Sequence, residues 1–348
     1  MRIDGTLIDD TFAEAFPMKA TRLVITAHTP TWARAAAQSL CGFATSVIDC
    51  GCEAGIEREI DAADTPDGRP GIAVLMFAVS SKELAKQIMR RVGQCVLTCP
   101  TTAVYSGIDP HTSRAPLSDL APLGGALRFF GDGWQIAKML GDTRYWRVPV
   151  MDGEFVCEES TVTVKAVGGG NLLLLARDID HALAAAEAAV AAMHQLPNVI
   201  TPFPGGVVRS GSKIGSKYAG AVASTNDPFC PTLVGVAKRT ELTAEVGCVL
   251  EIVIDGLTDA DVGAAMTAGI AAASRAGGVL RISAGNYGGK LGPYHFHLRE
   301  LAASIGTAAA VAAAGPRAGS QSGPQSDPPS GPQAGDGTPG PDDGGSTR

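Results

Sequence analysis

The fold prediction starts from residues 171–195, NLLLLARDIDHALAAAEAAVAAMHQ. Residues 172–176 are a continuous apolar run, which is typical of a buried strand. Asp178 then stands where a side chain caps the start of a helix, and the alanine-rich residues up to Gln195 are strong helix formers. A buried strand followed directly by a capped helix is the first part of a split βαβ unit.

The residues that follow complete this unit. A short strand is expected to begin at 199–201, and GCVLEIVID at 247–255 is predicted to be a buried strand. Thr258 is placed to cap a helix that runs to about Ala276. VLRISAG at 279–285 is predicted to be the last core strand.

The N-terminal part of the chain repeats this order of elements. It is expected to contain strands at 22–27, 43–49 (FATSVID), 72–79 and 95–99 (CVLTC), and helices at 30–40 and, capped by Ser81, up to 92. Both copies fit a ferredoxin-like unit of four antiparallel strands with two helices on one face. We therefore predict an α+β fold of two ferredoxin-like lobes related by an internal repeat, residues 1–145 and 146–301.

Two further segments lie outside this repeat. RFFGDGW at 128–134 and the residues from Tyr145 to Val164 predict an additional β ribbon, turned at Asp152-Gly153. Residues 302–348 are predicted to be a low-complexity flexible tail after a brief helical extension. From Pro316 onward the composition is rich in Gly, Pro, Ser, Gln and Asp and lacks large apolar residues.

Composition narrows the classes of function. The chain has 348 residues and a net charge of −7, so neither nucleic acid nor an anionic membrane is an expected partner. No stretch approaches the ~20 apolar residues that span a bilayer, and the charged N-terminus lacks the apolar core of a signal peptide. We therefore expect a cytoplasmic protein. The eight cysteines lack the spacing of a structural zinc site and are expected to be buried thiols.

The connection at 201–232 is longer in the second copy than in the first. The step from Leu23 to Ile72 spans 49 positions, whereas the equivalent step from Leu172 to Cys248 spans 76, so the second copy contains 27 additional residues. Compact domains rarely contain so long a loop without a function for it, although a glycine-rich surface loop that binds nothing is the alternative. We expect this one to be the active-site loop, with its glycines, cations and polar side chains binding substrate: Pro204, Gly205, Gly206, Ser212, Lys213, Lys217, Ser224, Thr225, Asn226 and Asp227.

The run GNYGGKLG at 285–292 follows the last predicted core strand and is a second candidate for substrate binding. Asn286 is a hydrogen-bond donor and acceptor, Tyr287 is able to stack on a ligand, and Lys290 is able to meet an anion. A simple turn with a solvated lysine is the alternative. His295 and His297 share a face of the next strand, but no third ligand is signalled, so no metal site is predicted.

Glu251 is the candidate catalytic residue. It interrupts the apolar strand CVLEIVID, and burial of a carboxyl group in such a strand raises its pKa. A carboxyl group with a pKa near neutrality is suited to general acid–base catalysis. Alternation along the strand leaves open that Glu251 instead faces solvent.

These motifs together resemble the formylmethanofuran:tetrahydromethanopterin formyltransferase family, over about residues 4–301. The resemblance rests on runs that are unusual in combination: DTFAEAF (10–16), TPDGRPG (65–71), SGSKIGSK (210–217), ASTNDPFCPT (223–232) and ISAGNYGGKLG (282–292). It implies two ferredoxin-like lobes in a subunit that commonly forms a homotetramer.

The resemblance also implies the reaction and the partners. A formyl group would move between N5 of tetrahydromethanopterin and the amine of methanofuran in a ternary complex, with both carriers as co-substrates and no tightly bound cofactor. Glu251 matches the glutamate that serves as general acid or base in the family. In bacteria with this pathway, the similar subunit works in formaldehyde oxidation, in a complex with an amidohydrolase-like hydrolase subunit.

Two other classes of function stay open at this level. One alternative is a non-catalytic assembly subunit that keeps the fold and binds a hydrolase. The other alternative is a metal hydrolase, and this hypothesis predicts bound zinc.

Overall fold

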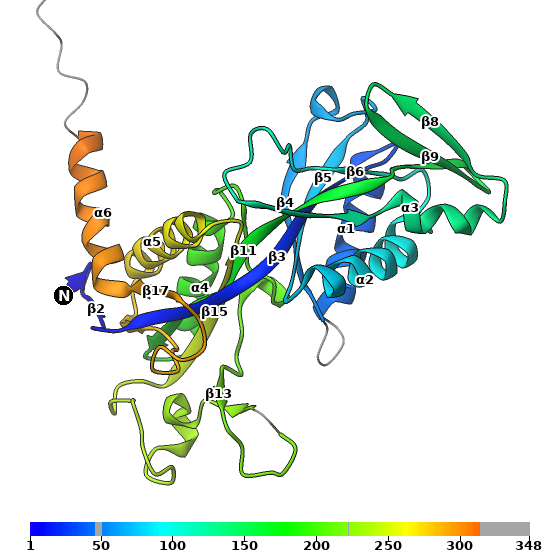
Figure 1. Cartoon of the computed structure of the whole chain (residues 1–348). Coiled ribbons are helices and arrows are strands. Elements are labelled where there is room, and N and C mark those ends of the chain that lie inside the picture. Colours follow the sequence, from blue (N-terminus) through cyan, green and yellow to red (C-terminus); the bar gives the residue numbers. More distant parts are fainter. Residues whose placement is uncertain (46–50, 222, 314–348) are drawn as a thin grey trace, which may run out of the picture.

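A computed structural model describes residues 1–45, 51–221 and 223–313. In these residues fifteen strands join in one mixed, mostly antiparallel sheet, and a separate two-stranded hairpin stands apart from it. Figure 1 shows that the long strands β3 and β11 extend from one half of the molecule into the other. Among the described residues, no helix has both the length and the apolar character needed to cross a membrane.

The elements have the following bounds. The strands are β1 (Arg2–Ile3), β2 (Thr6–Ile8), β3 (Phe12–Thr26), β4 (Glu53–Ile60), β5 (Gly71–Ala78), β6 (Ala103–Ser106), β7 (Leu117–Pro122), β8 (Ile136–Leu140), β9 (Thr143–Val150), β10 (Gly153–Glu158), β11 (Ser160–Ala176), β12 (Val199–Ile200), β13 (Ser212–Ile214), β14 (Ala223–Thr225), β15 (Cys248–Gly256), β16 (Val279–Ser283) and β17 (Tyr294–His297). The helices are α1 (Pro30–Thr45), α2 (Ser81–Arg91), α3 (Gly124–Leu127), α4 (Ile179–Met193), α5 (Asp259–Ala276) and α6 (Leu298–Ala313), with short turns η1 (Ala62–Asp64), η2 (Val92–Val96), η3 (Arg128–Gly131), η4 (Pro204–Gly206), η5 (Asp227–Phe229) and η6 (Pro231–Leu233).

Each half of the chain pairs four strands in the same order. In the N-terminal half the neighbours are β6, β3, β5 and β4, and in the C-terminal half they are β16, β11, β15 and β12. All of these pairs are antiparallel. Helices α1 and α2 bury their apolar side chains against the first set of strands, and α4 and α5 against the second.

Strands β3 and β11 hold the halves together. They pair with each other antiparallel from Phe16 to Ala20 and from Val164 to Gly168. The end of β3 pairs with β5 and the end of β11 with β15, each within its own half, whereas the start of β3 pairs with β17 and the start of β11 with β7, each in the other half. Arg22 on β3 adds a buried ion pair with Glu57, whose carboxylate also accepts a hydrogen bond from the backbone of Asn198 in the C-terminal half. The two halves therefore share one continuous sheet.

The predicted caps of two helices are confirmed. The side chain of Asp178 accepts a hydrogen bond from the backbone N–H of His181, and Thr258 accepts one from that of Asp261. The cap of α2 was predicted one residue too late, because Ser80 and not Ser81 accepts from Glu83.

Two predicted strands are wrong. The start of FATSVID, residues 43–45, is the last turn of α1, where Ala44 is fully buried in the core, and residues 46–49 lie outside the described residues. Cys95 and Val96 of CVLTC belong to η2, which continues α2, and the fourth strand of the unit is β6 instead, which lies between β3 and β10. A short apolar run does not distinguish a buried strand from a buried helical turn.

The ribbon agrees only in part with its prediction, and the described start of the tail segment agrees with it. Strands β9 and β10 pair antiparallel around Gly153, as predicted, but RFFGDGW begins in the helical turn η3 rather than in a strand. Helix α6 extends to Ala313, which confirms the brief helical extension predicted at the start of the 302–348 segment. The remainder of that segment lies outside the described residues.

Candidate active site

The long connection between β12 and β15 covers one face of the C-terminal sheet. Side chains alternate along a strand, so Leu250 and Ile252 face helices α4 and α5, whereas Glu251 points to the opposite face. There Leu242 and Val246 from the connection pack on Leu173 of β11. Figure 1 shows this connection, with hairpin β13–β14, standing out from the sheet. The connection thus closes over the face that carries Glu251.

Backbone pairing fixes the connection directly at Glu251. The backbone N–H of Val208 donates to the carbonyl oxygen of Glu251 at 2.7 Å, and the N–H of Glu251 donates back to Val208 at 2.8 Å. Leu173 is the neighbour of Glu251 on the other side of β15. Glu251 is therefore held between two backbones and does not lie on a free edge.

The carboxyl group of Glu251 is partly buried beside a cavity of about 30 Å³. Burial raises its pKa to about 7, as the sequence predicted. A methyl group at Gly211 would lie 2.6 Å from Oε2 of Glu251, so only glycine lets the loop approach the carboxyl group this closely. The cavity is also lined by Val208, Arg209, Thr225, Asn226, Phe229 and Cys230.

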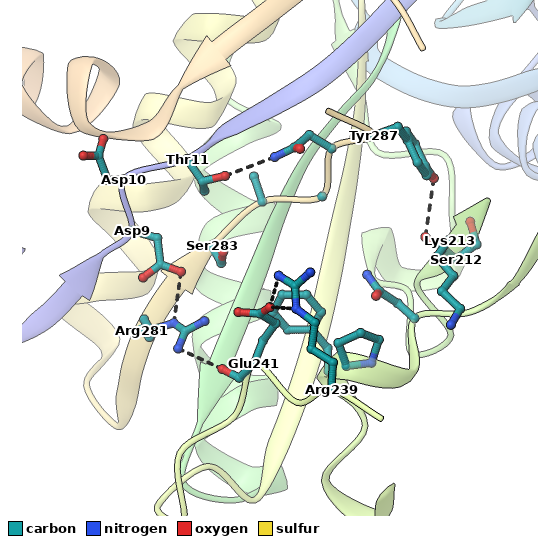
Figure 2. A pocket seen from close by; sticks show the side chains of 16 residues that line it. Asp9, Asp10, Thr11, Ser212, Lys213, Arg239, Glu241, Arg281, Ser283 and Tyr287 are labelled. Atoms are coloured by element: carbon teal, nitrogen blue, oxygen red, sulfur yellow. Dashed lines mark hydrogen bonds and ion pairs between the residues drawn. The ribbon is translucent and has the colours of Figure 1, made fainter. Parts of the chain in front are cut away.

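A larger cleft adjoins this cavity. Its volume is about 460 Å³, and Asn226 and Phe229 line both spaces. Figure 2 shows its walls, which come from the segment before β3, from the long connection and from the segment after β16. The cleft brings together chain segments that are more than 200 residues apart in sequence. The carboxyl group of Glu251, with a pKa of about 7, therefore lies near a space large enough for part of a substrate.

Charged and polar groups line the cleft in pairs. Nε of Arg281 lies 3.0 Å from a carboxylate oxygen of Asp9, and its Nη1 donates to the backbone carbonyl of Glu241 at 2.9 Å. Arg239 donates to the carboxylate of Glu241 at 2.6 Å. Lys213 on β13 forms an ion pair with the carboxylate of Asp227 in the same connection. The cleft therefore offers both cations and carboxylates to a polar ligand.

The segment after β16 forms the wall opposite the hairpin. The hydroxyl of Tyr287 donates to the carbonyl oxygen of Ser212 at 3.4 Å (Figure 2). The side-chain amide of Asn286 donates to Thr11 and Phe12 at 3.1 Å each. These bonds connect the 285–292 segment both to the hairpin and to the N-terminal residues.

The structure brings together about half of the residues predicted for the site. The cleft or the small cavity is lined by Ser212, Lys213, Thr225, Asn226, Glu251, Asn286 and Tyr287. The other predicted residues line neither space. These are Pro204, Gly205, Gly206, Lys217, Ser224, Asp227 and Lys290. The first three form η4 next to α4, and Asp227 forms an ion pair with Lys213.

Several residues of the cleft were not predicted from the sequence. These are Asp9, Asp10, Thr11, Pro228, Phe229, Arg239, Glu241, Arg281 and Ser283. Arg281 interrupts the apolar strand VLRIS in the way that Glu251 interrupts CVLEIVID, so the same signal was available for it. The N-terminal residues carry no such signal, because only the folded chain places them beside Arg281.

Metal ligands do not gather in the described part of the chain. Within residues 1–45, 51–221 and 223–313, no group of three His, Cys, Asp or Glu side chains is arranged to hold a metal ion. The rings of His295 and His297 lie 4.7 and 5.4 Å from the ring of Phe12.

A carboxyl group with a neutral-range pKa beside a polar cleft is the arrangement of an enzyme that transfers protons near neutral pH. The chain belongs to the formylmethanofuran-tetrahydromethanopterin formyltransferase family. The model of that family matches residues 1–150, and the model of the proximal lobe of the same enzyme matches residues 153–301.

Curated relatives give the same assignment. Formylmethanofuran–tetrahydromethanopterin formyltransferase of Methylococcus capsulatus is 62% identical over 306 residues, which covers 87% of this chain and 100% of the relative. A component of the formyltransferase/hydrolase complex of Methylorubrum extorquens is 51% identical and covers 86% of this chain and 96% of the relative.

Solved structures agree with these relatives. The formyltransferase/hydrolase complex of Methylorubrum extorquens, crystallised with methylofuran, contains a chain with a TM-score of 0.82 and 50% identity, covering 86% of this chain and 98% of that one. The formyltransferase of Methanosarcina barkeri has a TM-score of 0.79 and 46% identity, covering 86% and 100%.

Proposed function

We propose that this protein transfers a formyl group between N5 of tetrahydromethanopterin and the primary amine of methanofuran, with both carriers bound at once. The observation that carries the proposal is the carboxyl group of Glu251, with a pKa of about 7, beside a cavity that adjoins the polar cleft. Membership of the formyltransferase family supplies the two carriers. No tightly bound cofactor is part of the proposal.

Glu251 is the general acid and base of this transfer. The acceptor nitrogen attacks the formyl carbon, a tetrahedral intermediate forms, and the bond from that carbon to the donor nitrogen breaks. The attacking nitrogen must lose a proton and the leaving nitrogen must gain one. A single carboxyl group that is near half-ionised at neutral pH is suited to both transfers. No covalent intermediate with the enzyme is needed.

Binding is assigned to the residues predicted for this role: Pro204, Gly205, Gly206, Ser212, Lys213, Lys217, Ser224, Thr225, Asn226, Asp227, Asn286, Tyr287 and Lys290. The assignment is best supported for Ser212, Lys213, Asn226, Asn286 and Tyr287, which line the cleft. Asn226 also lines the cavity of Glu251, which supports a role for its amide as a donor to the developing oxyanion. Lys213 suits the carboxylates of methanofuran or the anionic tail of the pterin.

A transfer assay with purified protein and both carriers tests the proposal. Formyl-tetrahydromethanopterin and methanofuran are mixed with the enzyme, and transfer is followed by the change in pterin absorbance. Transfer that requires both carriers and saturates with each is the expected result. No transfer in either direction by folded protein would remove the proposed function and favour the non-catalytic assembly subunit.

We also propose that the chain assembles with amidohydrolase-like hydrolase subunits. The support is the relative from Methylorubrum extorquens, which is named as part of a formyltransferase/hydrolase complex. Co-expression with the hydrolase subunits of the same organism, followed by affinity purification through this chain, tests the assembly. Purification of this chain without them would contradict it.

A homo-oligomer, a tetramer or a dimer of dimers, is proposed for the isolated chain. The support is an apolar surface that runs from η3 to the start of β8, where Phe129, Trp134 and Ile136 are 67%, 79% and 57% exposed. Apolar surfaces of this kind are typical of protein interfaces. Light scattering after size-exclusion chromatography measures the mass, and a monomer at micromolar concentration would contradict the assignment.

We further infer that the two halves are ferredoxin-like lobes, residues 1–145 and 146–301, that arose from an internal repeat. The support is the identical pairing order in each half, in which the fourth strand of the unit neighbours the first, followed by the third and the second. Separate structural superposition of the two halves tests this inference.

A further inference from the structure

Glu14 is a buried carboxylate that the proposed mechanism does not use. It lies in β3, is 1% exposed, and stands opposite His295 of β17. Its side chain points to the segment after β16. Oε2 accepts hydrogen bonds from the backbone N–H groups of Tyr287 at 2.7 Å and Gly289 at 3.0 Å.

The other oxygen completes this set of bonds. Oε1 accepts from the backbone N–H groups of Leu291 and of Gly292, the second at 2.9 Å. Four backbone donors of one loop thus converge on one carboxylate, which is the geometry of a backbone anion nest. Gly288 and Gly289 have φ values of +70° and +75°, a conformation that glycine adopts without strain and that turns the N–H groups inward.

Charge explains why the nest holds. Burial alone favours the neutral acid, but the four backbone donors outweigh it and keep the pKa of Glu14 below its ordinary value. Glu14 is therefore ionised at neutral pH, and each N–H that it accepts is a charge-assisted bond. The loop at 286–292 has neither helix nor strand of its own, so these four bonds, together with the bonds of Asn286 to Thr11 and Phe12, hold its path.

The same loop forms one wall of the cleft. Tyr287, whose backbone N–H is bound by Glu14, extends its hydroxyl to the carbonyl of Ser212 on hairpin β13–β14. Asn286, the preceding residue, also lines the cleft. A displacement of the nest therefore moves both side chains relative to the hairpin.

We propose that Glu14 is a positioning residue, which holds the 286–292 loop in place so that Asn286 and Tyr287 bind a carrier in the cleft. The inference rests on the proposed function, since the carrier is a substrate of that reaction. Glu14 does not touch the reacting atoms, and it acts on binding rather than on the chemical step.

Glu14→Gln is the primary test. Glutamine keeps one acceptor oxygen but turns an NH₂ group toward two of the four donors, so it leaves them unsatisfied. We expect KM for one or both carriers to rise tenfold or more, kcat to fall less than threefold, and the pH midpoint of the rate to stay near 7. Hydrogen exchange of the 286–292 amides is expected to accelerate in the same variant.

Two further variants separate positioning from stability. Glu57→Gln changes another buried carboxylate, which pairs with Arg22 between the halves, and is expected to lower Tm without changing either KM. Gly288→Ala strains the backbone of the loop, because the φ of Gly288 is positive. The added methyl group causes no clash, since no atom lies within 4 Å of it. This variant is expected to raise KM as Glu14→Gln does, and it provides the test if Glu14→Gln does not fold.

The outcomes distinguish this inference from the proposed function. Absence of transfer by the unmodified protein overturns the proposed function. Hydrogen exchange of the 286–292 amides still measures, in that case, whether Glu14 holds the loop. Unchanged exchange at 286–292 in Glu14→Gln overturns the role of Glu14. Accelerated exchange with unchanged KM values also overturns it, as does a fall in kcat with no change in KM.

Discussion

Replacement of Glu251 by glutamine is the most informative perturbation of this protein. Glutamine keeps the size and polarity of the side chain but neither gives nor takes a proton at neutral pH. General acid–base catalysis contributes about 10²–10⁴ in rate, so we expect Glu251→Gln to lower kcat by that factor. This corresponds to roughly 3–5 kcal/mol of transition-state stabilisation.

The same substitution has an effect on stability that follows from the raised pKa. Ionisation of Glu251 is disfavoured in the folded chain, where its pKa is about 7 against 4.5 in the unfolded chain. The resulting penalty is absent below pH 4.5, grows as pH rises to 7, and is complete above pH 7. Its upper limit is about 3 kcal/mol, because the group is partly exposed and water screens it. Glutamine removes this penalty, so Glu251→Gln is expected to gain stability relative to the unmodified protein between about pH 5 and pH 8.

Two measurements check these expectations together. Formyl transfer is followed by pterin absorbance at saturating carriers, and Tm is measured from about pH 5 to pH 8. Glu187→Gln is the matched control, because it removes one exposed carboxylate from α4 and is expected to change neither quantity. Transfer at the unmodified rate would exclude Glu251 from the mechanism. A Tm difference that does not vary with pH would refute the assignment of a raised pKa.

Three other substitutions test the surroundings of the site. Gly211→Ala places a methyl group 2.6 Å from Oε2 of Glu251, so transfer is expected to fall at least tenfold in the same absorbance assay while Tm stays within a few degrees. Arg22→Ala leaves the carboxylate of Glu57 buried without its cation, and urea denaturation is expected to show a loss of about 3–5 kcal/mol. Lys213→Ala breaks a partly exposed ion pair with Asp227 and is expected to cost under ~1 kcal/mol of stability but to raise KM for an anionic carrier. Unchanged KM would remove Lys213 from binding.

The repeated order of strands and helices was largely predictable from the sequence. Buried strands such as 172–176 and capped helices such as the one after Asp178 have local signals, because apolar runs and capping side chains act over a few residues. Where a short apolar run lacked such a cap, at 43–45 and at 95–96, packing in the core produced helical turns instead.

The site was predictable only where a residue broke its local pattern. Glu251 stood out because a carboxylate in an apolar strand is costly, and the long loop stood out because only one copy of the repeat contains it. Asp9 lies beside Arg281 only in the folded chain, and no periodicity links the two positions.

The sequence by itself therefore determined the order of the elements, the family, and the presence of a perturbed acid next to a long loop. The tertiary structure decided that β3 and β11 run through both halves, and that the long loop closes over the Glu251 face. It also decided that Glu14 organises a loop that lies 273 residues further along the chain. Local signals reach a few residues along the chain, whereas these contacts depend on strand pairing between distant segments, which only the folded chain brings together.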